Sequence, residues 1–175
     1  MKSSLEIEAC SAADVNKISE VAIRAYRDFY LYLWEDDGSW YINRSFAPEQ
    51  IEKEINDTNA VYFSLKAEGE IVGFMKLNIN QPLKGHEEFD AMELERIYLL
   101  KAASGKGIGR QAVKFCIDFA KKKNKQIILL KSMDSSEAIY FYVRLGFVEC
   151  GNSRLDFELM KPAYRGMKTF MKKRT

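Results

Sequence analysis

Three glycines at alternate positions are the residues whose spacing most directly suggests chemistry in this chain. Gly105, Gly107 and Gly109 follow an apolar run typical of a strand and precede an amphipathic helical pattern. Glycines at a strand-to-helix junction leave backbone N–H groups uncovered where the helix dipole is positive, which suits a phosphate or pyrophosphate group. A tight turn that needs positive φ explains the same glycines, so a phosphate site and a plain turn are both open at this point.

Two flanking elements must position these glycines. A strand is predicted from Met92 to about Leu100, where apolar residues are dense. A helix is predicted from Ile108 to Phe119, because apolar residues recur there about three or four positions apart. Cys116 lies on the apolar stripe of that helix, so we expect a small core residue rather than a nucleophile.

The rest of the chain predicts one α/β domain over residues 1–175, without repeats or linkers. Further strands are predicted at residues 5–10, 61–66, 71–78, 126–130, from 147 onward and at 166–172. Further helices are predicted at residues 15–29, 48–57 and 138–145. The segment Ala67-Glu68-Gly69-Glu70 indicates a hairpin, and Ser11 to Asp14 resembles a capping box that opens the first helix.

Composition argues against several classes of protein. Hydrophobic residues make up 47% of the chain, and 27 basic residues nearly balance 25 acidic ones, so a net charge of +2 argues against a nucleic-acid binder. No apolar run reaches transmembrane length, so no membrane partner is expected. Three cysteines without metal-ligand spacing favour reduced thiols in the cytoplasm. A single histidine, His86, leaves a Ser/His/Asp triad or a His-rich metal site poorly supplied, and no metal is expected.

An aromatic tract from Tyr26 to Tyr41 surrounds an acidic turn, Glu35-Asp36-Asp37-Gly38. The tract fits a satellite core under a loop, and it also fits an aromatic wall beside carboxylates that would bind an organic cation. A second acidic group, Glu87, Glu88 and Asp90, lies in a polar loop at residues 81–90. The two acidic groups could surround the entrance for a cationic substrate, and solvated loops are an equally good interpretation.

Two motifs in order give the chain a resemblance to a known family. Gly105-Lys106-Gly107-Ile108-Gly109-Arg110 stands behind a strand, and Ala138-Ile139-Tyr140-Phe141-Tyr142 with Gly146-Phe147 follows further along. With a strand between them and a hairpin before them, these motifs resemble the GNAT family of N-acetyltransferases over nearly the whole chain. Residues 93–98 and the order of the N-terminal elements look most like the PaiA-type polyamine acetyltransferases.

The resemblance implies a mixed, mostly antiparallel sheet, flanked by helices, that splays in the middle and holds acetyl-CoA in the opening. The backbone at Ile97, Tyr98 and Leu99 would pair with the pantetheine arm. Backbone amides would hold the pyrophosphate at Gly105, Lys106, Gly107, Ile108, Gly109 and Arg110. The family usually has Gln or Arg at the position of Ser104 and often Asn at that of Ser135, so these two side-chain contacts to the cofactor should be weaker here.

The chemistry implied is acetyl transfer to an amine, which needs a proton acceptor because an ammonium group with a pKa of about 10 is not a nucleophile. Glu93 and Glu95 alternate with Leu94 and should project from one face of the strand. The family often uses a strand glutamate here, and we favour Glu95 slightly, although both carboxylates could merely pair with Arg96 or solvent. Tyr142 matches the family's helix tyrosine, which protonates the leaving thiolate, and its alternative role is that of a core aromatic residue.

The expected function is transfer of an acetyl group from acetyl-CoA to a primary amine of a small molecule, with spermidine or spermine as candidates, by direct attack in a ternary complex. An enzyme that acetylates a protein N-terminus or lysine is the first alternative. A CoA-sensing module without turnover is the second, motivated by Ser104 and Ser135. The exposed ends of such a sheet also make a homodimer an expectation.

Overall fold

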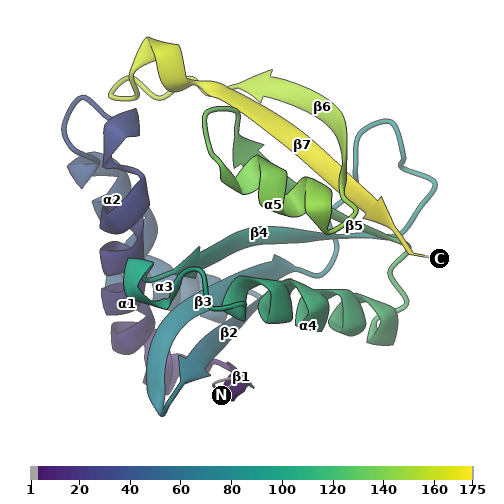
Figure 1. Ribbon diagram of the computed structural model, residues 1–175, viewed down its shortest axis with the longest axis horizontal. Helices are drawn as coiled ribbons and strands as arrows, with labels where there is room; N and C mark the ends of the chain where they lie inside the picture. Colours follow the sequence, from purple (N-terminus) through teal and green to yellow (C-terminus); the bar gives the residue numbers. More distant parts are fainter. Residues whose placement is uncertain (1–3, 175) are drawn as a thin grey trace.

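A seven-stranded mixed sheet organises the computed structural model, which describes residues 4–174 (Figure 1). The strands are β1 Leu5–Ala9, β2 Ala60–Ala67, β3 Glu70–Asn78, β4 Ala91–Leu99, β5 Ile127–Met133, β6 Val148–Arg154 and β7 Gly166–Lys173. The α-helices are α1 Val15–Phe29, α2 Ser39–Phe46, α3 Pro48–Ile55, α4 Ile108–Lys122 and α5 Ala138–Arg144. The strand order is β1-β2-β3-β4-β5-β7-β6, and within residues 4–174 only the β4–β5 pair is parallel. The predicted fold class is confirmed.

Local sequence signals explain where several elements begin and end. Ser11 Oγ accepts a hydrogen bond from Ala13 N at 3.3 Å, and Asp14 Oδ2 accepts one from Ser11 N at 2.8 Å, so the predicted capping box forms. Glu68 and Gly69 join β2 to β3 with φ values of 54° and 80°, as a tight hairpin turn with two left-handed residues requires.

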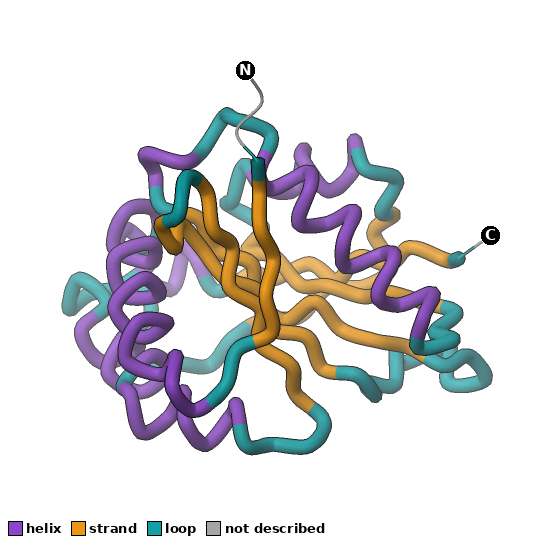
Figure 2. The backbone as a smooth tube through the Cα atoms, turned by 90° about the horizontal axis from the view of Figure 1, so that it is seen from below, coloured by secondary structure: helices purple, strands orange, loops and turns teal. Residues whose placement is uncertain are grey.

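Helices cover the two faces of the sheet in separate groups, as Figures 1 and 2 show. On one face α1, α2 and α3 form a buried cluster with the strands that includes Ile18, Phe46, Ile51, Tyr62 and Phe74. On the other face α4 and α5 form a second cluster that includes Leu65, Met75, Leu94, Cys116 and Tyr142. Cys116 is therefore a core residue, as predicted. Within residues 4–174, none of the helices combines the length and the apolar character needed to cross a bilayer.

The sheet opens between β4 and β5 (Figure 1). The two strands are paired only where Ala91 to Glu93 meets Ile127 to Leu129. Beyond Glu93, β4 stays paired with β3 as far as Leu99 but no longer pairs with β5. The splay implied by the resemblance is present, and it leaves one edge of β4 without a strand partner in the middle of the molecule.

One helix lies where the sequence predicted none. α2 begins near the end of the aromatic tract, at Ser39, and continues beyond it to Phe46, and its start is explained by a short polar side chain just upstream. Asp36 accepts hydrogen bonds from Gly38 N at 3.0 Å and from Trp40 N at 2.8 Å. A carboxylate that accepts from the first free N–H groups of a helix stabilises its N-terminus. Part of the acidic turn therefore has a structural role.

Candidate active site

A cavity of about 800 Å³ lies where β4 and β5 separate, and we call it the larger cavity. It is formed by the end of β4, by the glycine loop at residues 105–109 and by the segment that precedes α5. Most of the predicted cofactor-binding residues line it, namely Ile97, Tyr98, Leu99, Ser104, Gly105, Gly107, Gly109, Arg110 and Ser135. Residues far apart in the sequence are thus brought together as the resemblance implied.

The glycine loop leaves its inner side open. Gly105 and Gly107 have φ values of 76° and 79°, and a methyl group added to either would meet no other group within 4 Å. Gly107 is the N-terminal cap of α4, whose first helical residue is Ile108, so the free N–H groups of the first turn lie beside the larger cavity. The loop is therefore both a turn that needs positive φ and an open cradle for an anion.

Two of the predicted cofactor-binding residues do not line the larger cavity. The Ile108 side chain is only 2% exposed and belongs to the core, and Lys106 is exposed. The resemblance implies that both residues contact the pyrophosphate through their backbone amides. Neither the buried side chain of Ile108 nor the exposed side chain of Lys106 prevents such a contact.

The two serines that depart from the family pattern already have hydrogen-bond partners. Ser104 Oγ donates to the Leu100 carbonyl at 3.4 Å. Ser135 Oγ lies 2.9 Å from the Tyr32 hydroxyl, so it links the segment before α5 to the segment after α1. Tyr32 also lines the larger cavity, and in the sequence it stood out only as one member of the aromatic tract from Tyr26 to Tyr41.

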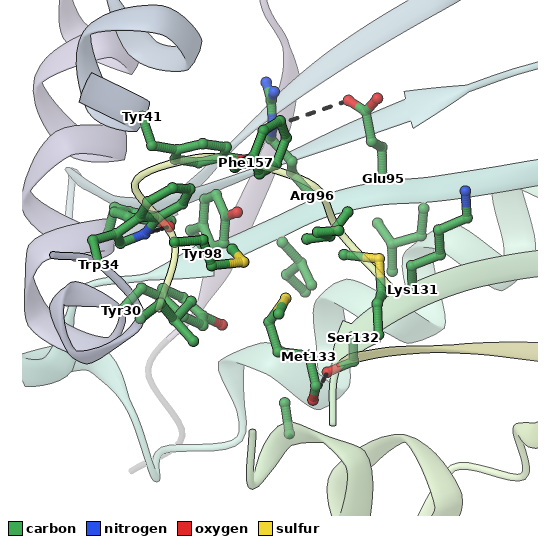
Figure 3. A pocket seen from close by; sticks show the side chains of 18 of the residues that line it. Tyr30, Trp34, Tyr41, Glu95, Arg96, Tyr98, Lys131, Ser132, Met133 and Phe157 are labelled. Atoms are coloured by element: carbon green, nitrogen blue, oxygen red, sulfur yellow. Dashed lines mark hydrogen bonds and ion pairs between the residues drawn. The ribbon is translucent and has the colours of Figure 1, made fainter. Parts of the chain in front are cut away.

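A second cavity of about 310 Å³, the smaller cavity, adjoins the first. Tyr30, Ile97, Tyr98, Ala138 and Tyr142 line both. Figure 3 shows rings on one side of the smaller cavity and charged side chains on the other. The aromatic wall comprises Tyr26, Tyr30, Trp34, Tyr41 and Phe157, and the charged wall comprises Glu93, Glu95, Arg96 and Lys131.

The aromatic wall is assembled from both ends of the chain. Its last member, Phe157, lies in the connector between β6 and β7, residues 155–165. Backbone hydrogen bonds of 2.8 and 2.9 Å join this connector to Leu33 and Glu35. They bring the Phe157 ring to a centroid distance of 6.0 Å from Trp34.

Glu93 is the buried carboxylate of the charged wall. Glu93 is only 7% exposed, and its carboxylate accepts a hydrogen bond of 3.1 Å from Asn78 Nδ2. Burial raises the pKa of Glu93 and the charge of Glu95 raises it further, although the Asn78 hydrogen bond opposes both. A carboxylate with a raised pKa is a better proton acceptor near neutral pH.

Glu95 borders the same cavity, so both glutamates do lie on one face, but Glu95 is already engaged. Where β3 pairs with β4, Lys76 lies opposite Arg96, and the next residue of β3, Leu77, lies opposite Leu94. Glu95 is therefore the extra residue of a β-bulge. Its Oε2 atom lies 2.6 Å from Lys76 Nζ. The two atoms form an ion pair, but their angles are not those of a hydrogen bond. Glu95 Oε2 has no hydrogen-bond partner among the described residues. The geometry favours Glu93 over Glu95 as the free base.

A buried network of charges lies behind the charged wall. Glu54 of α3 accepts hydrogen bonds from the Tyr62 hydroxyl at 2.6 Å, from Lys76 Nζ at 2.9 Å and from Arg96 Nη1 at 3.0 Å. Burial opposes the ionisation of Glu54, but Arg96, Tyr62 and Lys76 together outweigh it and lower the pKa of Glu54. The network fixes Lys76 against Glu95 and compensates the charge of Arg96.

Tyr142 of α5 stands where the two cavities meet. It is 8% exposed, and burial raises the pKa of its hydroxyl, as do the neighbouring Tyr30 and Cys116. The hydroxyl is therefore protonated at neutral pH and can act as a proton donor.

A family model described as "Acetyltransferase (GNAT) family" matches residues 19–147. The chain belongs to the GNAT family. An uncharacterized N-acetyltransferase from Lactobacillus delbrueckii subsp. lactis is 25% identical over 135 residues, which cover 72% of this chain and 78% of the relative. This GNAT protein is an acetyl-CoA-dependent N-acetyltransferase, and the size of the larger cavity and its open glycine cradle fit that cosubstrate.

Solved structures share the fold along nearly the whole chain. The PaiA N-acetyltransferase from Thermoplasma acidophilum, crystallised with coenzyme A, matches with a TM-score of 0.78 and 21% identity, over 98% of this chain and 99% of that one. A spermidine N-acetyltransferase from Vibrio cholerae matches with a TM-score of 0.69 and 20% identity, over 97% and 93% of the two chains. The splayed sheet of this GNAT protein is thus the arrangement of its relatives.

The two acidic groups, which the sequence left open as an entrance or as solvated loops, do not line the cavities of this GNAT protein. Neither Glu35-Asp36-Asp37 nor the group Glu87, Glu88 and Asp90 contributes to the lining of the two cavities. The carboxylates that stand opposite the aromatic wall are Glu93 and Glu95. Aromatic rings therefore do lie beside carboxylates, which was one of the two interpretations of the tract, but the carboxylates are not those of the acidic turn.

Sequence reasoning also missed two residues that shape the site of this GNAT protein. Lys76 lies between Met75 and Leu77 in β3 and is 6% exposed, and a lysine in such an apolar strand was a signal that a buried carboxylate must face it. Phe157 lies in an irregular connector, and no local pattern pointed to it.

Proposed function

We propose that this GNAT protein transfers the acetyl group of acetyl-CoA to a primary amine of a small molecule by direct attack in a ternary complex. The observation that carries the proposal is the junction of the two cavities at Tyr142, Ile97 and Tyr98. The larger cavity would hold acetyl-CoA along the backbone of residues 97–99 and on the amides of residues 105–110. The smaller cavity would hold the amine.

Glu93 is the proposed proton acceptor. It takes a proton from the substrate's ammonium group, directly or through one water molecule, and the amine nitrogen that results can attack the acetyl carbon. Acetyl-CoA supplies that carbon in a thioester, so a C–N bond forms while the C–S bond breaks. The nitrogen loses its second proton to solvent as the amide forms, and solvent returns a proton to the group that protonates the leaving sulfur. Glu95 remains paired with Lys76.

Tyr142 is the proposed proton donor to the leaving sulfur. A thiol of pKa about 8.5 leaves more readily when its sulfur is protonated as the C–S bond breaks. The edge of β4 beyond Glu93 has no β5 partner, so its backbone N–H groups could also stabilise the developing oxyanion. No acyl-cysteine intermediate is needed, and Cys116 is buried in the core.

The identity of the amine is a separate question. Polyamines such as spermidine and spermine are one candidate class, suggested by the name of the Vibrio cholerae neighbour. A protein N-terminus is a second candidate, because a ribosomal-protein-alanine N-acetyltransferase from Brucella melitensis shares the fold with a TM-score of 0.69. The smaller cavity is enclosed by aromatic residues from two distant segments, which favours a small molecule over an extended peptide.

Release of free thiol from acetyl-CoA tests the proposal. The assay should compare polyamines, simple monoamines, amino acids, aminoglycosides and short peptides, with the acetylated product identified by mass. We expect release with at least one class of small amine. Binding of coenzyme A without release on any acceptor would favour a CoA sensor, and release confined to peptides would contradict the small-molecule assignment.

The location of the protein and its oligomeric state are two further proposals. We propose a cytoplasmic location, which is consistent with the three free cysteines Cys10, Cys116 and Cys150. We also propose a homodimer, because β1 and β6 are the two edge strands of the sheet and expose backbone groups that another chain could pair with. Light scattering at several protein concentrations would test the second.

A further inference from the structure

The charges of the smaller cavity are nearly all compensated by the protein itself. Glu95 is paired with Lys76 at 2.6 Å, and Arg96 is paired with Glu54 at 3.0 Å. Glu93 is the remaining carboxylate, and the proposed function uses it to take the proton of the reacting ammonium group. Lys131, also in the lining, is a cation that forms no ion pair within residues 4–174. A second ammonium group of a substrate would therefore find no carboxylate in this cavity that is not already ion-paired or used by the reacting nitrogen.

The wall that faces these charges presents aromatic rings and no charged group, and its polar atoms are the hydroxyls of its tyrosines and the indole N–H of Trp34. Trp34 and Tyr41 stack with centroids 5.0 Å apart and an interplanar angle of 23°, and Phe157 lies 6.1 Å from Tyr41. The indole N–H of Trp34 is already donated to the Tyr26 hydroxyl at 2.7 Å. The apolar lining also includes Leu33, Leu94, Met133, Leu155, Met160 and Met167. Sulfur and ring surfaces of this kind suit a flat or aliphatic group.

We propose that the acceptor is a monoamine whose body, beyond the reacting nitrogen, is an apolar aromatic or aliphatic group, and that a polyamine is a poor substrate. The inference rests on the proposed function. Its physical basis is the cost of desolvation. An ammonium group moved from water into the aromatic end of the cavity, without a carboxylate partner, loses more in hydration than a cation–π contact returns. An apolar group of the same size gains from the same transfer.

A matched pair of amines tests this directly. Hexylamine and 1,5-diaminopentane have the same number of non-hydrogen atoms and differ at the far end, where a methyl group replaces an ammonium group. We expect kcat/KM of the wild-type protein, measured by thiol release, to be at least about 100-fold higher for hexylamine. 2-Phenylethylamine should equal or exceed hexylamine, and spermidine should resemble the diamine. Equal or higher kcat/KM for the diamine or spermidine would overturn the inference.

Variants at Phe157 locate the effect in the aromatic wall. Phe157→Glu supplies the missing carboxylate, so the diamine-to-hexylamine ratio of kcat/KM should rise at least about 10-fold over the ratio for Phe157→Gln, which has the same shape without the charge. Tyr140→Glu is the matched control, because Tyr140 is 67% exposed and lines neither cavity, and its ratio should equal that of the wild type. An unchanged ratio in Phe157→Glu, with the KM for acetyl-CoA intact, would place the amine elsewhere.

The outcomes also separate this inference from the proposed function. Efficient acetylation of diamines or polyamines by the wild-type protein would leave the acetyltransferase function standing and overturn only the monoamine assignment. No thiol release on any small amine, with coenzyme A still bound, would overturn both.

Discussion

Glu93→Gln should remove general-base catalysis and leave the fold intact. Glutamine has nearly the shape of glutamate, and its amide oxygen can still accept the 3.1 Å hydrogen bond from Asn78. General-base catalysis contributes about 10²–10⁴-fold, so kcat/KM should fall by that factor, equivalent to about 3–5 kcal/mol in the activation barrier. Glu95 cannot take over the role, because its carboxylate is held by Lys76 at 2.6 Å.

The pH dependence distinguishes the two glutamates more sharply than the rates do. The base must be deprotonated to act, so activity of the wild type should rise with pH through the pKa of Glu93. Burial and the charge of Glu95 raise that pKa above the ordinary value of 4.5. Glu95→Gln removes one of these causes, so the rise should move to lower pH, with less than about a 10-fold loss in the plateau value of kcat/KM. Glu93→Gln should abolish the rise.

Initial rates of thiol release at saturating acetyl-CoA, measured from acidic to alkaline pH, provide the assay for the wild type and both variants. Unfolding midpoints of the three proteins serve as the control for a change in fold. If Glu95→Gln abolishes the rise with pH and Glu93→Gln retains it, Glu95 is the base, and the reasoning from the Lys76 ion pair is refuted.

Three further predictions concern the remaining parts of the site. Tyr142→Phe should lower kcat about 100-fold, because the leaving sulfur loses its proton donor, and should leave the Kd of coenzyme A in calorimetry unchanged. Gly107→Ala and Gly69→Ala should each destabilise the fold by about 1 kcal/mol, because both positions have φ near 80° with open space around them, but only Gly107→Ala should weaken coenzyme A binding. Glu54→Gln should lower the free energy of unfolding by about 3 kcal/mol at neutral pH, because it leaves buried cations without their partner.

The Glu54 prediction has a pH signature with a definite sign. The folded state lowers the pKa of Glu54 below 4.5, so the stability that its ionised form contributes is present above that pH. It is lost as the pH falls through the folded-state pKa, and denaturant unfolding of the Glu54→Gln variant should lack this loss.

An equal effect of Gly107→Ala and Gly69→Ala on coenzyme A binding would contradict the cradle, and a collapse of affinity in Tyr142→Phe would make Tyr142 structural.

Most of the fold could be predicted because its signals are local. The capping box at Ser11 to Asp14 and the turn at Glu68 and Gly69 depend on residues within a few positions of one another, and both form as predicted. The cradle at residues 105–109 also follows from neighbouring residues, since glycine spacing and helix start lie together in the sequence.

The acceptor side could not be predicted, because it depends on contacts between distant segments. Phe157 reaches Trp34 only because the connector pairs with the segment after α1. Glu95 forms its ion pair with Lys76 of the neighbouring strand at a β-bulge. The alternation of Glu93 and Glu95 with Leu94 in the sequence does not reveal that bulge. α2 was missed because its aromatic and polar residues have modest helix propensity and its N-terminal cap, Gly38, has no capping side chain, while the carboxylate that accepts from this end of the helix, Asp36, lies two residues further upstream.

The aromatic wall and the glycine cradle come from different parts of the chain, and this has an evolutionary consequence. The larger cavity is built mainly from the continuous stretch of residues 97–142, whereas the aromatic wall draws on residues 26–41 and on the connector at 155–165. Mutations at positions of these two segments that line only the smaller cavity, such as Trp34, Tyr41 and Phe157, can alter which amine fits while the thioester site is inherited unchanged. A lineage built on this plan can therefore diversify its acceptors by drift or recombination in the flanks, without passing through an ancestor that has lost its acetyl donor.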